Sequence, residues 1–234
     1  MLGVCESDSI LSQAGDHEAE ESMTTVGVKE FLGMMQGAAR KVKEEHALLS
    51  RLDAAIGDGD HGITMLRAMS LTEKAVAEDK SNDLQGLLYT LGWTLLGVDG
   101  GSTGPLLGSW FLGMSEFAGD KQALDVQTLA ATFEAGLIAV MKQTKAQIGD
   151  KTMIDALLPA VEALQSGAAA NHGIEEALRA AASAAQQGAL STKNFVARFG
   201  KAKFAGERTV GHQDPGATSI ALMFQGFAEG LADR

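Results

Sequence analysis

The sequence has 234 residues, of which 45% are hydrophobic, and its formal net charge is −11. Such a chain is long enough to bury a full core, and an acidic chain without basic runs argues against nucleic-acid binding. A single cysteine, Cys5, excludes an internal disulfide and a multi-cysteine zinc site, and no apolar run is long enough to cross a membrane. We therefore expect a cytoplasmic protein whose metals are held by oxygen or histidine ligands.

Residues 1–22 differ in composition from the rest of the chain. They hold six of the 30 acidic residues and no lysine or arginine, and they lack helical periodicity. A second methionine, Met23, stands where that periodicity begins and is a candidate start of the native chain. We expect a disordered acidic extension over residues 1–22 and a folded helical domain over residues 23–234.

The folded part is predicted to be all-α. Strand signals are weak, whereas apolar residues recur at three- and four-residue spacing in eight segments bounded by Gly, Asp, Asn or Pro. Pro105 and Pro215 fit first-turn positions, and Trp93 and Trp110 are expected to pack in the core. The predicted helices span residues 25–50, 62–78, 83–98, 105–118, 126–146, 152–166, 173–198 and 214–231.

The connections between these helices are of two kinds. Those after the second, fourth and sixth helices resemble ordinary solvated turns, whereas the other four are rich in Gly with Asp, Ser, Thr or Lys. They read LDAAIGDGDHG, VDGGSTGP, QIGDKTM and FGKAKFAGERTVGHQDPGA. In an antiparallel up-and-down barrel the odd-numbered connections lie at one end, so four loops distant in sequence would meet at one rim. The alternative is that Gly and Asp merely terminate the helices.

The first of these loops holds the sharpest cluster of acidic residues. Asp53, Asp58 and Asp60 lie within eight residues, on a loop loosened by glycines, and they would repel one another unless solvated or bound to a hard cation. The spacing fails as an EF-hand, because, counting Asp58 as the first position, the twelfth is Met69 rather than glutamate. The loop therefore indicates either a Mg²⁺ site completed by phosphates or a solvated acidic turn.

Two further loops precede helices. DGGSTGP places Ser102 and Thr103 among glycines ahead of Pro105, where backbone N–H groups and the helix dipole favour an anion, although a flexible linker has the same composition. GHQDPGA places Asp214 as the N-cap of the last helix. His61, directly after the acidic loop, is a candidate phosphate contact or acid–base group.

Taken together, these motifs resemble a known family. The blocks LDAAIGDGDHG, GGSTGPLLG, GDKTMIDALLPAV and GERTVGHQDPGATS follow the order and spacing of the nucleotide-binding L subunit of dihydroxyacetone kinase, and the resemblance covers about residues 25–231. It implies a DhaL-type, eight-helix antiparallel barrel that binds ADP or ATP at one rim through Mg²⁺, with two ions expected.

The resemblance also assigns individual residues. It implies that the metal ligands are Asp53, Asp58 and Asp60. Thr64 stands where asparagine is common in the family, Thr144 where a glycine contacts the nucleotide, and Lys201 where arginine is common, and lysine lacks the planar fork of arginine. The implied nucleotide contacts are His61, Gly62, Ile63, Thr64, Ser102, Thr103, Thr144, Met153, Lys201, Asp214, Pro215 and Gly216.

The implied chemistry is phosphoryl transfer to dihydroxyacetone held covalently by a histidine of a separate K subunit. Such transfer depends mainly on positioning and charge neutralisation, so no catalytic base is assigned in this chain. Two mechanisms stay open: bound ADP recharged by a phosphohistidine protein of the phosphotransferase system, or a kinase of dihydroxyacetone or another short ketose with exchangeable ATP. A further alternative is a regulatory module that reports nucleotide state to a transcription factor.

Overall fold

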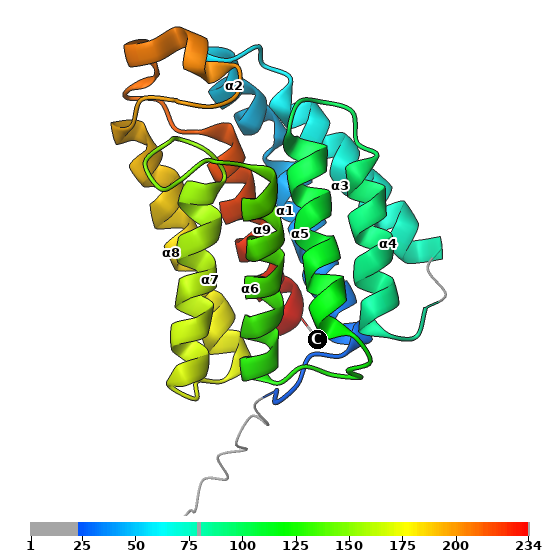
Figure 1. The fold of residues 1–234 in the computed structure, drawn as a ribbon. Helices are drawn as coiled ribbons and strands as arrows, with labels where there is room; N and C mark the ends of the chain where they lie inside the picture. The colour runs from blue at the N-terminus through cyan, green and yellow to red at the C-terminus, as the bar shows by residue number, and fades with distance from the viewer. Residues whose placement is uncertain (1–22, 79–80, 234) are drawn as a thin grey trace, which may run out of the picture.

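The computed structural model describes residues 23–78 and 81–233, and the predicted extension over residues 1–22 lies outside this range. In the described part, nine α-helices alternate with loops and two 3₁₀ helices (Figure 1). The elements are α1 (Val28–Glu44), α2 (His46–Ile56), α3 (His61–Glu78), α4 (Leu84–Leu96), α5 (Thr103–Ala118), α6 (Val126–Gln143), α7 (Ile154–Ala169), α8 (Ile174–Ser191), η1 (Thr192–Asn194), η2 (Ala202–Thr209) and α9 (Pro215–Ala232).

Eight of the helices form a closed ring. From α3 to α9 each helix packs against the next in sequence, and α1 packs against both α9 and α3, which closes the barrel. The short α2 continues from α1 and packs on α3. The predicted all-α, eight-helix antiparallel barrel is confirmed. No helix in the described ranges is long and apolar enough to span a bilayer.

The barrel interior is filled by aromatic side chains. Trp110 of α5, Phe133 of α6 and Phe224 and Phe227 of α9 are fully buried, with ring centroids 5.6–6.2 Å apart. Such rings bury large apolar areas and dominate core energetics. The core prediction is therefore confirmed for Trp110. It is wrong for Trp93, which is 55% exposed on α4.

Helices α1 and α9 meet at backbone distance because both present glycine. A Cβ atom on Gly37 would lie 2.0 Å from the carbonyl oxygen of Gly226, and one on Gly230 would lie 2.1 Å from that of Gly33. Small residues at these positions let the last helix pack tightly against the first. This contact holds the C-terminal half of α9 against the first half of α1.

The first predicted helix, residues 25–50, is wrong at both ends. The helix breaks at Glu45, and α2 then extends to Ile56. At the break, the ring Nδ1 of His46 lies 2.8 Å from the carbonyl oxygen of Lys43, an acceptor that a continuous helix would use for its backbone. One consequence bears on function, because Asp53 lies in the last turn of α2 and not on a loop.

Two other helices end earlier than predicted. Helix α6 ends at Gln143 rather than residue 146, and α8 ends at Ser191 rather than residue 198. The residues after α8 form η1 and η2 instead. As a result, the α6–α7 and α8–α9 connections are longer than the helical periodicity indicated. They lie at the upper end of the barrel in Figure 1, where α3, α5, α7 and α9 begin.

Candidate functional site

The four glycine-rich connections surround one cavity of about 570 Å³ at this end of the barrel. Each contributes to its wall, with Asp58 from the α2–α3 connection, Gly101 from α4–α5, Thr152 from α6–α7 and Phe204 from α8–α9. The volume is within the usual range for small-molecule pockets. The predicted convergence of the odd-numbered loops is confirmed.

Three carboxylates cluster on one side of the cavity. Asp53, Asp58 and Asp60 each offer one oxygen, and these oxygens lie within 4.8 Å of one another. Asp53 is held in place by the backbone N–H of His61, which donates to its Oδ2 at 3.1 Å. A Cβ atom on Gly57 would lie 2.3 Å from Oδ1 of Asp53, so glycine is needed there for this side-chain position.

A lysine from a distant segment contacts this acidic cluster. The ammonium of Lys201 donates to Asp58 and lies 3.4 Å from Oδ2 of Asp60. The hydrogen bond from Lys201 lowers the pKa of Asp58, and its counterpart from Asp58 raises the pKa of Lys201. The acidic cluster thus forms ion pairs with a cationic side chain of the same protein. Its all-oxygen donor set and its spacing also fit a hard divalent cation such as Mg²⁺.

His61 connects three helices at the edge of the acidic cluster. Its Nε2 lies 2.7 Å from Oγ of Ser219, and its Nδ1 lies 3.5 Å from Oγ1 of Thr103. Because Ser219 gives its own proton to the carbonyl of Pro215 at 3.0 Å, we assign the proton of the imidazole to Nε2. Burial lowers the pKa of His61, although Asp53 and Asp60 oppose the shift, so we take the ring as neutral at pH 7.

Four helices begin at the cavity, because the first residues of α3, α5, α7 and α9 lie in its wall. Helix N-termini carry a partial positive charge and unpaired N–H groups, and they bind anions. Ser102 and Met153, the N-cap residues of α5 and α7, make no side-chain cap hydrogen bond in the described structure. The first turn of α5 is therefore free of a side-chain cap, whereas in α7 the N–H of Ile154 donates to Oγ1 of Thr152 at 3.2 Å.

Helix α9 differs because Asp214 caps it. One oxygen of Asp214 accepts the N–H of Ala217 at 2.7 Å, and the residue is buried. Desolvation by burial raises its pKa to about 7, against the lowering effect of the Ala217 hydrogen bond. This carboxyl group therefore keeps its proton to a much higher pH than an exposed aspartate does.

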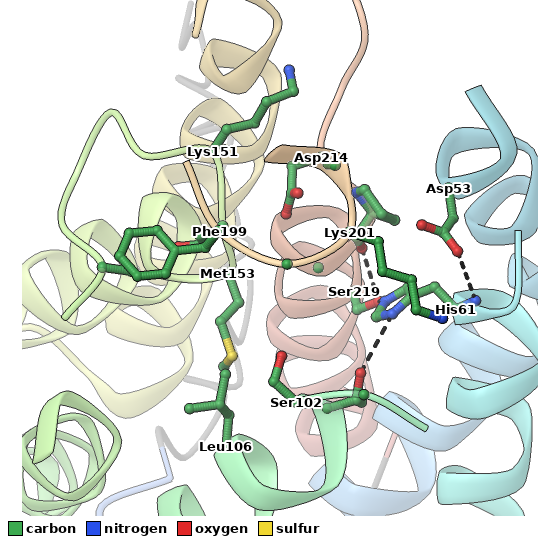
Figure 2. A pocket seen from close by; sticks show the side chains of 18 of the residues that line it. Asp53, His61, Ser102, Leu106, Lys151, Met153, Phe199, Lys201, Asp214 and Ser219 are labelled. Atoms are coloured by element: carbon green, nitrogen blue, oxygen red, sulfur yellow. Dashed lines mark hydrogen bonds between the residues drawn. The ribbon is translucent and has the colours of Figure 1, made fainter. Parts of the chain in front are cut away.

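The opposite side of the cavity is apolar (Figure 2). Leu106, Met153 and Phe199 lie together there, away from Asp53 and His61. The cavity therefore has an apolar half and a charged half. A nucleotide has the same division, with a flat base at one end and phosphates at the other.

Most residues that the sequence singled out lie in the cavity wall. They are Asp53, Asp58, Asp60, His61, Ser102, Thr103, Thr144, Met153, Lys201, Asp214, Pro215 and Gly216. That they contact a metal or a nucleotide stays a prediction.

Gly62, Ile63 and Thr64 are not in the wall, because the first turn of α3 rotates them away. Gly62 packs against α2, Ile63 is 51% exposed, and Thr64 is buried beneath Gly100. A contribution from these three would have to come from backbone N–H groups.

Sequence reasoning missed four residues that shape the site. Ser219 lies one helical turn after Pro215, so its position on the cavity side of α9 followed from the predicted helix. Leu106 and Phe199 carry no chemical signature that separates them from core residues. Lys151 stands in the quoted block GDKTM, but its side chain points away from the cavity in Figure 2.

Comparison with known proteins places the chain in a family. The DAK2 domain family matches residues 55–229, and the chain therefore belongs to the DAK2-domain family. Within it, the chain is 42% identical over 184 residues to the ADP-binding subunit DhaL of PEP-dependent dihydroxyacetone kinase 1 of Listeria innocua, covering 79% of this chain and 87% of that protein. The corresponding DhaL subunit of Escherichia coli is 40% identical over 181 residues, with 77% and 86% covered.

A solved structure shows the same fold. The dihydroxyacetone kinase from C. freundii in complex with AMP-PNP and Mg²⁺ superimposes with a TM-score of 0.67 at 27% identity. The match covers 97% of this chain and 38% of that one. The resemblance indicated by the four sequence blocks is confirmed.

Proposed function

We propose that this chain is the nucleotide-binding L subunit of a dihydroxyacetone kinase of the phosphotransferase-system type. It binds ADP or ATP with Mg²⁺ at the cavity end of the barrel and passes a phosphoryl group to dihydroxyacetone held on a separate K subunit. The observation that carries the proposal is the three-aspartate cluster, with its oxygens within 4.8 Å, beside the starts of four helices. The names and titles of the relatives support the same ligands.

The division of the cavity suggests how a nucleotide is oriented. The base would lie against Leu106, Met153 and Phe199, where apolar surface is available. The phosphates would lie toward the N-terminus of α5, where Ser102 makes no side-chain cap hydrogen bond. Asp53, Asp58 and Asp60 would hold Mg²⁺, which neutralises phosphate charge and orients the phosphates when bound.

The remaining polar residues position charge rather than exchange protons. Neutral His61 offers an unprotonated Nδ1 toward Thr103, and its Nε2 proton is engaged with Ser219. Lys201 provides a positive charge that can move from the carboxylates to a phosphate once a metal takes its place. No side chain in the described cavity wall is assigned as a catalytic base, which agrees with a transfer that depends on positioning.

The donor of the phosphoryl group distinguishes the mechanisms. We propose that ADP stays bound and is recharged by a phosphohistidine protein of the phosphotransferase system, in the cytoplasm. Purified protein should then release about one ADP per chain on denaturation, and bound ADP should exchange only slowly with labelled ATP. Rapid exchange would favour a kinase in which ATP is a free substrate.

Partners can be identified by affinity capture with the full chain as bait. A K-type subunit that retains dihydroxyacetone is the expected partner, and the captured pair should phosphorylate the sugar when the phosphohistidine protein is added. Capture of a DNA-binding regulator instead, without sugar kinase activity, would support the regulatory alternative.

A further inference from the structure

Lys151 is a buried lysine that the proposed chemistry does not use. Its side chain is almost fully buried, at 2% exposure, in the α6–α7 connection. Its Nζ donates to the carbonyl oxygen of Thr192 at 2.5 Å and to the carbonyl oxygen of His212. Lys151 borders the cavity, but in Figure 2 its side chain extends away from the other labelled residues, and its ammonium is engaged by backbone carbonyl groups.

The two carbonyl groups belong to the two ends of one segment. Residues 193–211, here called the rim segment, leave the barrel after Thr192 and return at His212, just before α9. The place where the two ends of the rim segment meet is here called the neck. Two backbone N–H donors also join the chain there: Gly211 donates to the carbonyl of Lys193 at 2.7 Å, and Asp214 donates to Oγ1 of Thr192 at 2.9 Å. Lys151 lies outside the rim segment and bridges the two chain segments that meet at the neck.

The rim segment carries Phe199 and Lys201 into the cavity wall. Outside the neck, its described polar links to the rest of the chain are few. Arg198 donates its N–H to the carbonyl of Asp150 at 3.1 Å and pairs with the Asp150 side chain at 3.5 Å, and Lys201 pairs with the acidic cluster. The neck is therefore one of the few polar links in the described structure that fix the rim segment, and with it Lys201.

The loop that presents Lys151 is itself fixed. Asp155, at the start of α7, accepts the N–H of Gly149 at 2.6 Å and that of Thr152 at 2.7 Å, on either side of the lysine. Lys151 has a φ of 61°, which is uncommon for a residue with a side chain. Unusual backbone of this kind persists only where its surroundings enforce it, which fits a residue placed for its side chain.

We propose that Lys151 is a positioning residue that ties the two ends of the rim segment together and so holds Lys201 and Phe199 over the bound nucleotide. The proposal rests on the proposed function for the identity of the ligand. It predicts that loss of the ammonium loosens the rim segment without removing any group that touches the nucleotide. Hydrogen bonds from a charged donor are among the stronger ones in proteins, so two of them can control such a segment.

The test compares Lys151→Met with Lys145→Met, which removes an exposed lysine from the same connection. Hydrogen–deuterium exchange is measured on nucleotide-free protein, and dissociation of a fluorescent ADP is measured by stopped flow in the presence of Mg²⁺. For Lys151→Met we expect exchange across residues 193–211 and ADP dissociation each to be about tenfold faster or more. Lys145→Met should match the wild type in both.

Wild-type values for Lys151→Met in the exchange measurement would overturn the proposal. If Lys151→Met does not fold, Lys151→Gln keeps a donor for one carbonyl, and its rim segment should exchange at an intermediate rate. In the wild type, the amides of Gly211 and Asp214 should exchange more slowly than that of Lys203, and equal rates would also overturn it. Because exchange is measured without ligand, failure of the wild type to bind ADP would contradict only the proposed function.

Discussion

Aspartate residues have different surroundings at the two ends of this barrel. At the end away from the cavity, α4 and α6 start after Asp83 and Asp125, whose carboxylates accept the N–H groups of Gly86 at 2.6 Å and Thr128 at 2.8 Å. At the cavity end, α5 starts without a side-chain cap in the described structure. A cap of this kind contributes about 1 kcal/mol of stability, so the start of α5 forgoes stability where a ligand can bind instead.

The same residue type therefore has two roles. Asp83 and Asp125 act singly, each bonded to backbone of its own helix. Asp53, Asp58 and Asp60 instead lie close to one another, where their charges repel unless a cation is present. Asp214 combines the two situations, because it caps α9 as Asp83 and Asp125 cap their helices, and it also borders the cavity. Substitutions at the two ends should separate stability from ligand binding.

The largest effect is expected for Asp58→Asn. Removing one of three clustered carboxylates should weaken Mg²⁺-dependent ADP binding by about 100-fold or more, since even indirect supports of a metal site matter 10- to 100-fold. It should also abolish the increase in melting temperature that Mg²⁺ and ADP produce together. Isothermal titration calorimetry and thermal melts measure the two effects. Unchanged ADP affinity would show that the acidic cluster is a solvated turn.

A second prediction concerns pH and Asp214. Because its folded pKa is about 7 while its unfolded pKa is near 3.8, the folded state binds the extra proton between these values, and stability falls as pH rises through that window. The contribution should decrease by about 2 kcal/mol between pH 5 and pH 7. Asp214→Asn can still accept from Ala217 but does not titrate, so its unfolding free energy in urea should lack this decrease. Parallel pH curves for the two proteins would refute the assignment.

Lys201→Met should change two affinities in opposite directions. Without nucleotide, Mg²⁺ should bind about threefold to fivefold more tightly, because the ammonium no longer competes for Asp58 and Asp60. Mg²⁺–ADP should bind more weakly by a similar factor, because the phosphates lose a positive partner. Titrations of Mg²⁺ alone and of ADP at saturating Mg²⁺ distinguish the two. Equal shifts in the same direction would contradict the exchange of partners by Lys201.

The smallest effect on binding is expected for Asp83→Ala at the far end. It removes the acceptor for Gly86 and should lower the free energy of unfolding by about 1 kcal/mol. ADP affinity should be unchanged, which makes this variant the control for Asp58→Asn. A loss of ADP affinity here would mean that the two ends are not independent.

The sequence predicted the ring of helices because apolar periodicity and punctuation are local signals. It also predicted the shared rim, because an up-and-down order places alternate connections at one end. Asp53 shows a limit of this reasoning, since composition alone placed it on a loop while it lies in the last turn of α2. Trp93 shows another, because an aromatic residue in a helix does not reveal which face is buried.

Long-range contacts could not be predicted. The pairing of Lys201 with Asp58 joins residues 143 positions apart, and Lys151 reaches carbonyl groups 41 and 61 positions away. Such contacts depend on how the rim segment folds back, and its 3₁₀ helices have no clear periodicity. The resemblance implied a nucleotide contact for Thr64, yet helical rotation buried this residue beneath Gly100.

The central claim is that the acidic cluster binds nucleotide through Mg²⁺, and calorimetric titration of nucleotide-stripped protein with ADP tests it most directly. With Mg²⁺ present, the account predicts one ADP bound per chain. With excess EDTA it predicts a loss of affinity comparable to that of Asp58→Asn. ADP binding that is equally tight in Mg²⁺ and in EDTA would contradict it.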